Sequence, residues 1–247
     1  MDEAWRALRE RIATAPSICV LTGAGMSAES GIPTFRDSKT GLWARFDPAQ
    51  LASEEGFRAD PAMVWDWYAE RRVAVRAAQP NAGHRALAAF AQRRPGVLTV
   101  VTQNVDDLHQ RAGNVETIRL HGDILSDRWL ERCRESPACA VSTARPGRPP
   151  RCERCANLLR PGVVWFGEML PTAALDAAER AAAACALMLV VGTSGAVWPA
   201  AGLAALAHRA GAHVAIVNPQ PSEIDDDADS TIRGTAATVL PALFAAA

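Results

Sequence analysis

A glycine-rich turn near the start of the chain has the residue types of a dinucleotide-binding loop. Three small residues directly follow the apolar run 18–21, which is short enough to be a buried parallel strand: Gly23, Ala24 and Gly25. Small residues here let the backbone approach a pyrophosphate, and Ala28 stands where the third glycine of the common pattern occurs. A tight structural turn would explain this short motif alone. The polar segment 27–36 is long for a strand-to-helix connection, however, so we expect it to close over a bound molecule.

Four of the six cysteines form one cluster in the sequence: Cys133, Cys139, Cys152 and Cys155. The second pair has the two-residue spacing with which two thiolates bind one tetrahedral zinc ion. The first pair is wider, so its loop bulges outward, or the site is distorted or vacant. Reduced free cysteines are the alternative. Clustering in a reducing compartment favours a metal over disulfides, and four thiolates leave no open coordination position, so we predict a structural zinc ion.

Polar residues also stand at the ends of other predicted strands: Gln103, Asn104, Asp106, Thr193, Ser194 and Asn218. Open α/β sheets bind ligands at the carboxyl ends of their strands. Helix capping is the alternative for Asn104 and Asp106. His121 follows the apolar run 117–120, and Gly122 lets the chain turn so that the imidazole faces a cleft. A hydrogen-bonded packing histidine is the alternative there, and we predict structural roles for the other four histidines.

One predicted helix carries residues that could bind an acid. Tyr68 is the only tyrosine in the chain, and Arg71 lies three residues on, so both side chains project from one helix face. A guanidinium together with a phenol hydroxyl is well suited to bind a carboxylate. The alternative is a solvated or salt-bridged Arg71, because arginine supplies nearly every cation of a chain whose only lysine is Lys39.

Short apolar runs alternate with segments of helical pattern along most of the chain. The apolar runs predict strands at 18–21, 97–102, 117–120, 187–191 and 214–218. The alanine-rich segments predict helices at 84–92, 173–184 and 200–210. This alternation is typical of an α/β fold with a Rossmann-type, mainly parallel sheet.

Two insertions interrupt the α/β pattern. The first contains a predicted helix with Asp60 as its cap and Pro61 at its first position. The second holds the cysteines and the breaker-rich stretch 142–150, which we predict to be a mobile connection with neither helix nor strand. The insertions predict a smaller lobe beside the large α/β part.

The chain has 247 residues, of which 49% are hydrophobic and 21% charged, as is typical of a folded globular enzyme. Its formal net charge of −1 gives no sign of nucleic-acid binding. Residues 1–15 predict a charged amphipathic helix rather than a signal peptide, and no apolar run approaches the roughly 20 residues of a membrane helix. We expect a cytoplasmic monomer that binds neither nucleic acid nor membranes.

The glycine-rich turn belongs to a longer motif, G-A-G-x-S-x-x-S-G-I-P-x-F-R, that ends at Arg36. Further blocks follow in order: T-Q-N-V-D (102–106), L-H-G (120–122), V-V-W-F-G-E (163–168), G-T-S (192–194) and V-N-P (217–219). In sequence and order these blocks closely resemble the sirtuins, the NAD-dependent protein lysine deacylases. The resemblance spans nearly the whole chain, and a generic Rossmann protein is the alternative.

The resemblance implies that NAD is bound and consumed as a co-substrate. The implied cofactor-binding residues lie in the glycine turn and its loop, at the strand ends and near the C-terminus: Gly23, Ala24, Gly25, Ser27, Ala28, Glu29, Pro33, Thr34, Phe35, Arg36, Trp43, Gln103, Asn104, Asp106, Gly192, Thr193, Ser194, Asn218, Pro219, Gln220 and Ala236. Phe35 and Arg36 match the residues that hold the phosphates and shield the reacting sugar carbon. Gln103 and Asn104 match contacts to the nicotinamide ribose, and Asp106 matches a contact to the nicotinamide amide or its support.

The resemblance also implies the reaction. The acyl oxygen attacks the ribose carbon as nicotinamide leaves, and the acyl group moves to ADP-ribose. His121 matches the general base that takes a proton from a ribose hydroxyl, and Asn104 is the second implied catalytic residue. One further segment matches the part of sirtuins that binds the peptide: Val164, Trp165, Phe166, Gly167 and Glu168. In sirtuins this segment pairs with the substrate backbone, so that the peptide is added as a strand. An ordinary edge strand is the alternative. Tyr68 and Arg71 match sirtuins that remove succinyl or malonyl groups.

These interpretations predict one sirtuin catalytic domain. Its large Rossmann-type part comprises 1–36, 80–122 and 163–247, and its small lobe comprises a helical part, 37–79, that holds the acyl pocket, and a zinc module, 123–162. The predicted activity is NAD-dependent removal of succinyl, malonyl and acetyl groups from lysines of proteins or peptides. The alternatives are a mono-ADP-ribosyltransferase and a non-enzymatic NAD sensor, and an intact His121 and Asn104 speak against a sensor.

Overall fold

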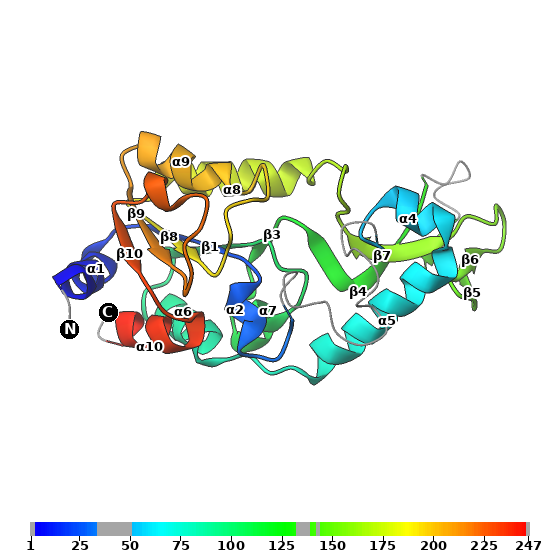
Figure 1. The fold of residues 1–247 in the computed structure, drawn as a ribbon, viewed down its shortest axis with the longest axis horizontal. Helices are drawn as coiled ribbons and strands as arrows, with labels where there is room; N and C mark the ends of the chain where they lie inside the picture. The colour runs from blue at the N-terminus through cyan, green and yellow to red at the C-terminus, as the bar shows by residue number, and fades with distance from the viewer. Residues whose placement is uncertain (1–2, 34–50, 132–138, 142–143, 246–247) are drawn as a thin grey trace. The chain divides into compact units, whose positions relative to one another are not determined.

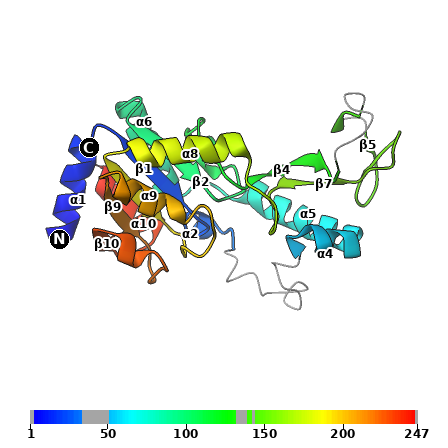
Figure 2. The same ribbon diagram turned by 90° about the horizontal axis from the view of Figure 1, so that it is seen from above.

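The computed structural model describes most of the chain, in four stretches: residues 3–33, 51–131, 139–141 and 144–245. The chain divides into two units, shown in Figures 1 and 2. The first unit is formed by three segments: Met1–Thr34, Ala78–Leu120 and Leu170–Ala247. The second unit is formed by two: Phe35–Ala77 and His121–Met169.

Six parallel strands form one sheet in the first unit. They are β1 (Ile18–Thr22), β2 (Leu98–Thr102), β3 (Ile118–Arg119), β8 (Leu187–Val191), β9 (His213–Val217) and β10 (Ser230–Ile232). Their order is β10-β9-β8-β1-β2-β3, so the first strand of the chain lies in the middle. Every residue of β1 and β8 is buried, because helices cover both faces of the sheet. The predicted α/β fold with a Rossmann-type parallel sheet is confirmed.

The helices of the first unit form a layer on each side of this sheet (Figure 1). They are α1 (Glu3–Thr14), α2 (Gly25–Ala28), α6 (Ala82–Arg93), α7 (Leu108–Ala112), α8 (Thr172–Ala184), α9 (Gly202–Arg209), the 3-10 helix η3 (Asp225–Asp227) and α10 (Ala236–Phe244). Successive side chains of a strand point to opposite faces of the sheet. Val20 therefore packs with α1, α6 and α10, whereas Leu21 packs with α8 and α9 on the other face. Among the described helices, none combines the length and apolar character needed to cross a membrane.

The described part of the second unit contains helices and small antiparallel sheets (Figure 2). Its helices are α4 (Glu54–Ala59) and α5 (Pro61–Ala77), and its strands are β4 (Gly122–Trp129), β5 (Ala144–Arg145), β6 (Arg151–Cys152) and β7 (Leu159–Val163). Strand β4 pairs with β7, and β5 pairs with β6. Asp60 Oδ1 accepts a hydrogen bond from Met63 N at 2.9 Å, which confirms the predicted cap of α5.

Two sequence interpretations differ from the structure. The stretch 142–150 contains strand β5, because Ala144 and Arg145 pair with Cys152 and Arg151. The structure also places His121, Gly122 and residues 163–169 in the second unit, although the sequence interpretation assigned them to the large part. The physical reason is the pairing of β4 with β7, which sets Gly122 opposite Val163.

Two buried histidines join α6 and α7 in the first unit. The His84 and His109 rings lie 4.8 Å apart, edge to face, and both side chains are fully buried. Asn81 N donates to His84 Nδ1 at 3.3 Å, and His109 Nε2 lies 3.1 Å from Thr22 Oγ1. Burial lowers the pKa of His84 to about 4, with Arg85 and Arg111 adding to the shift. Burial, followed by the neighbouring His84, lowers the pKa of His109 to about 3. Both rings are therefore neutral at pH 7.

This pair predicts a loss of stability in mild acid. An unfolded histidine binds a proton near pH 6.5, whereas the folded pair does not, so the free energy of unfolding should fall as the pH drops below about 6.5. The slope should reach about 1.4 kcal/mol per pH unit for each histidine. Urea unfolding at several pH values measures it, and the variant H109Q should show a shallower slope. An equal slope in wild type and H109Q would contradict the assignment.

Candidate active site

The glycine turn after β1 presses against the turn after β8. A Cβ atom on Gly25 would lie 2.8 Å from Gly192 Cα, and a Cβ on Gly23 would lie 2.7 Å from Thr193 Cβ. Gly192 itself has φ +63°, and a Cβ there would lie 2.5 Å from Met26 N. Side chains at these positions would push the two turns apart. The small residues thus bring together two loops at the carboxyl ends of neighbouring strands, where open α/β sheets bind ligands.

A buried hydrogen-bond network fixes the side chains at the end of β2. Asn104 Nδ2 donates to Gly23 O at 3.0 Å and to Ser27 Oγ at 3.2 Å, and Ser27 Oγ donates to Asp106 Oδ2 at 2.9 Å. Asp106 Oδ1 accepts from Leu108 N at 3.0 Å. Burial raises the pKa of the Asp106 carboxyl, against the lowering effect of the bonds from Leu108 and Ser27. The structure thus brings together three of the predicted residues, and Asp106 also binds the first N–H group of α7, whose N-cap residue is Asp107.

The loops after β8 and β9 are joined at the same edge of the sheet. Gln103 Nε2 donates to Thr193 Oγ1 at 3.2 Å, so the ends of β2 and β8 are linked across β1. Asn218 Nδ2 donates to Thr193 O at 3.3 Å and to Gln220 O at 2.9 Å. Ser194 O accepts a hydrogen bond from Glu223 N at 2.9 Å. The predicted residues of both loops therefore lie next to one another.

Glu29 binds to the last helix of the chain. Its Oε2 accepts a hydrogen bond from Ala237 N at 3.0 Å, in the first turn of α10. A carboxylate there is favourable, because the first backbone N–H groups of a helix have no partner within the helix. Ala236, also predicted to bind the cofactor, is buried in the same turn. Five predicted site residues lie outside the described stretches of the chain: Thr34, Phe35, Arg36, Trp43 and Cys133.

His121 is the first residue of the second unit. Its side chain is half-buried, and its carbonyl oxygen accepts a hydrogen bond from Val164 N at 2.9 Å. Gly122 has φ +83°, and a Cβ atom there would lie 2.2 Å from Gly162 O, so only glycine permits this turn. The His121 backbone is thereby fixed to the predicted substrate-binding segment, which begins at Val164.

The segment 164–168 is an irregular turn that follows β7. Trp165 N donates to Glu168 Oε2 at 2.8 Å, and Phe166 N donates to Ala52 O at 2.8 Å. Glu168 also pairs with Arg160 and Arg128. Although burial opposes the shift, bonds from Arg160 and Trp165 N lower the pKa of Glu168, which is therefore ionised. The Glu168 carboxylate holds the segment in shape.

Tyr68 and Arg71 lie on α5 beside this segment. Tyr68 is buried and its hydroxyl oxygen accepts a hydrogen bond from Trp165 Nε1 at 3.0 Å. The Arg71 guanidinium carbon lies 4.8 Å from the centre of the Trp67 ring, which also packs edge-on against Tyr68. Burial lowers the pKa of Arg71, against the opposing effect of Tyr68. The two predicted acid-binding residues thus share one aromatic cluster.

The next arginine of α5 has a different role. Arg72 donates to Ile124 O at 2.6 Å and to Ser126 O at 3.0 Å, and it forms an ion pair with Asp127 at 2.5 Å. The Arg72 side chain is 11% exposed. It therefore ties α5 to β4, and its replacement should destabilise the second unit.

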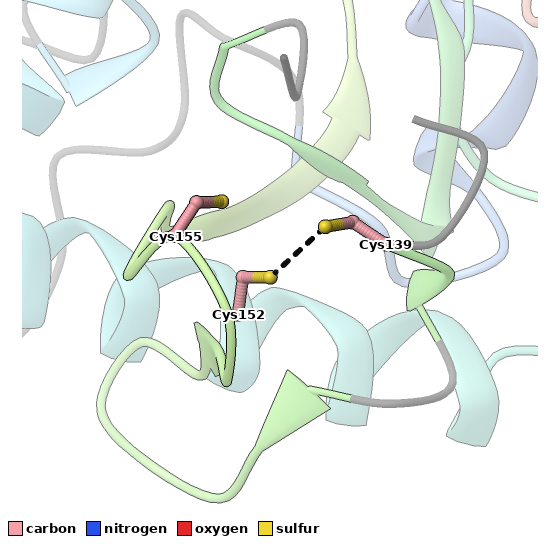
Figure 3. A group of neighbouring side chains, drawn as sticks. All are labelled: Cys139, Cys152 and Cys155. Atoms are coloured by element: carbon pink, nitrogen blue, oxygen red, sulfur yellow. Dashed lines mark hydrogen bonds between the residues drawn. The ribbon is translucent and has the colours of Figure 1, made fainter. Parts of the chain in front are cut away.

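Three cysteines of the predicted zinc module come together (Figure 3). The Sγ atoms of Cys139, Cys152 and Cys155 all lie within 4.8 Å of one another, and those of Cys139 and Cys152 are 3.4 Å apart. Tetrahedral zinc with bonds of about 2.3 Å places its sulfurs about 3.8 Å apart, so the three residues fit this ion. Backbone N–H groups of Cys155 and Arg154 lower the pKa of Cys152 to about 7, which favours the thiolate that zinc binds.

Sequence interpretation missed several residues that hold the site in place. Thr22 Oγ1 donates to Thr102 Oγ1 at 2.8 Å, and Thr102 Oγ1 accepts from Asn104 N at 3.0 Å. Both threonines end paired strands of the sheet, and Thr22 lies one residue beyond the predicted strand 18–21, so knowledge of the strand pairing would have revealed them. Arg119 Nη2 donates to Val105 O at 2.8 Å, and Arg160 holds Glu168. Arginine is so common in this chain that no sequence signal distinguished these two.

An open parallel sheet with a glycine turn and polar loops at its strand ends defines a Rossmann-type nucleotide-binding protein, here with a cysteine module in a second unit. The model of the Sir2 family matches residues 23–199. The chain belongs to the Sir2 family, which confirms the resemblance to the sirtuins.

Individual relatives agree with this assignment. The chain is 56% identical over 237 residues to an "NAD-dependent protein deacylase" of Ralstonia nicotianae, covering 96% of this chain and 94% of the relative. It superimposes with a TM-score of 0.86 and 42% identity on a Sir2 homologue in complex with NAD, covering 100% of this chain and 93% of that one. A Sir2 structure with a bound propionylated peptide gives a TM-score of 0.80 at 30% identity, covering 95% and 94%.

The cysteine cluster predicts about one zinc ion per chain. The substitution C152S should release the metal and lower the melting temperature of the second unit, because structural zinc contributes directly to folding. Elemental analysis with thermal unfolding measures both effects. C185S, which replaces a buried cysteine of the first unit, is the control and should keep the metal. A metal-free wild-type protein with full activity would contradict the zinc assignment.

Proposed function

We propose that this protein removes succinyl or malonyl groups, as well as acetyl groups, from lysines of proteins or peptides. The broader activity, NAD-dependent protein deacylation, follows from its place in the Sir2 family and from relatives that bear this name. The finer preference rests on one observation, the pairing of Tyr68 and Arg71 in a single aromatic cluster of α5.

The first unit supplies the residues that hold NAD. The close contact between Gly25 and Gly192 brings the turns after β1 and β8 together at the carboxyl ends of these strands, where open α/β sheets bind dinucleotides. Asn104, Ser27 and Asp106 keep one another in place, so their remaining polar groups are oriented before a ligand arrives. NAD supplies the leaving group and the acyl acceptor, and the chain supplies orientation.

His121 acts as the general base. Its backbone is fixed by the bond from Val164 N and by the turn at Gly122, next to the segment proposed to bind the acylated peptide. The bonds to Gly23 and Ser27 hold the Asn104 amide group in one orientation. An amide held in this way can keep a ribose hydroxyl in place while a base removes its proton.

Arg71 and Tyr68 recognise the carboxylate at the end of the acyl chain. The Arg71 guanidinium has lost part of its water through burial, so it attracts a carboxylate more strongly than an exposed arginine does. Stacking on Trp67 fixes its position. Tyr68 adds a hydroxyl donor on the same face of α5. Two donors that converge on one carboxylate favour an acidic acyl group over acetyl.

Replacement of His121 should abolish most of the deacylation. The variant H121A removes the general base, so turnover should fall by roughly 10²–10⁴-fold, while the fold and the affinity for NAD stay close to wild type. Release of nicotinamide with an acyl-lysine peptide measures turnover, and NAD titration measures affinity. H208A replaces a more exposed histidine and is the control. Near-normal turnover of H121A would remove His121 from the mechanism.

Replacement of Arg71 should change the acyl preference. The variant R71M keeps the aliphatic stem and removes the charge, so kcat/KM for succinyl-lysine should fall roughly tenfold to a hundredfold more than that for acetyl-lysine. Y68F should reduce the succinyl activity less, because the guanidinium remains. The ratio of the two kcat/KM values for matched peptides measures the preference.

The matched control is R76M. Arg76 is an exposed residue in the last turn of the same helix, and its replacement should leave the ratio unchanged. Arg72 is unsuitable as a control because it ties α5 to β4. An equal loss of both activities in R71M would show that Arg71 is structural and would end the proposal of an acidic acyl preference.

A further inference from the structure

Trp165 is hydrogen-bonded at both its backbone and its side chain. Its side chain is only 2% exposed. Trp165 N donates to Glu168 Oε2 at 2.8 Å, and Trp165 Nε1 donates to the Tyr68 hydroxyl oxygen at 3.0 Å. The indole therefore links the segment predicted to bind the peptide to the helix predicted to bind the acyl group.

An ion pair and a stacked guanidinium hold this indole in place. Arg160 Cζ lies 3.2 Å from the centre of the Trp165 ring, and Phe57 packs at 5.2 Å between ring centres. Arg160 pairs with Glu168 and donates to Val163 O at 2.7 Å, and its side chain is 1% exposed. Arg128 Nη2 adds a bond to Glu168 Oε2 at 2.7 Å. Rotation of the indole would break this packing, so the direction of its N–H group is fixed.

The fixed N–H group decides how the Tyr68 hydroxyl can bond. An indole nitrogen only donates, so the Tyr68 oxygen must accept from it, and the phenol proton must point elsewhere. A guanidinium also only donates, so Arg71 cannot accept that proton. Glu168 acts on Tyr68 electrostatically, but its carboxylate already accepts from Arg160, Arg128 and Trp165 N. A carboxylate bound at Arg71 would provide an acceptor for that proton.

We propose that Trp165 is a positioning residue for acyl specificity: its indole N–H orients the Tyr68 hydroxyl as a donor to the carboxylate of an acidic acyl group. The inference rests on the proposed preference for such groups. It extends that proposal, because Trp165, a residue outside α5, sets the direction in which the Tyr68 hydroxyl donates its hydrogen bond. The Arg160–Glu168 pair acts through Trp165 and takes no part in the chemistry.

The variant W165F tests the kinetic consequence. Phenylalanine keeps an aromatic ring beside Arg160 and Phe57 but lacks the N–H donor. The ratio of kcat/KM for succinyl-lysine over acetyl-lysine should fall roughly threefold to tenfold, the size expected for one hydrogen bond, with the loss mainly in the succinyl KM. In the Y68F background the same substitution should leave the ratio unchanged. An equal effect of W165F in both backgrounds would overturn the inference.

A spectroscopic measurement tests the hydrogen bond without catalysis. Tyr68 is the only tyrosine, so protein labelled at the tyrosine Cζ gives one NMR signal, whose shift reports bonds to the phenol oxygen. W165F should move this signal, whereas the control W5F, in helix α1, should not. If W165F does not fold, Y68F provides the reciprocal test, because the Trp165 indole N–H signal should shift when its acceptor is removed. Unmoved signals would overturn the inference.

The two proposals fail in different ways. If wild type shows no preference for succinyl-lysine over acetyl-lysine, the proposed acyl preference is wrong and the role of Trp165 in specificity falls with it. If wild type prefers succinyl-lysine but W165F changes neither the ratio nor the Tyr68 signal, only the inference about Trp165 is overturned.

Discussion

The first unit depends on the contact between the turn after β1 and the turn after β8. Gly25 and Gly192 approach so closely that neither position accepts a Cβ atom. Because β1 and β8 are neighbours in register from Ile18 opposite Leu187 to Thr22 opposite Val191, their ends must meet at this point. The polar residues at the neighbouring strand ends are set by the same register, so the position of the proposed cofactor site follows from the order of strands in the sheet.

Much of this arrangement could be predicted from the sequence. Apolar runs bounded by glycine or polar residues marked the longer strands, and β8 was predicted with its observed bounds, Leu187–Val191. Gln103, Thr193 and Asn218 could be grouped from the sequence because each stands at the end of a predicted strand, and in the structure hydrogen bonds join them. Such residues are predictable because a parallel sheet places the carboxyl ends of its strands at one edge, whatever the length of chain between them.

Other features could not be predicted because they depend on pairing between distant segments. Arg72 and Arg71 are neighbours in the sequence, yet one ties α5 to β4 and the other stacks on Trp67. Only the three-dimensional position of β4 separates these roles. Likewise, the Arg160–Glu168 pair depends on the turn after β7. The short strand β5 was missed because two residues carry too little periodicity, and its pairing with β6 determines it.

The bond between Glu29 and the first turn of α10 bears on how the protein is made. Its partners are 208 residues apart in the chain, and the contact of Gly25 with Gly192 also joins distant segments. Synthesis proceeds from the N-terminus, so the glycine turn after β1 leaves the ribosome long before β8 and α10 exist. The turn can take up its final contacts only after β8 and α10 have been synthesised. A nascent chain stalled before α10 would therefore contain the glycine turn without the helix whose N–H group binds Glu29.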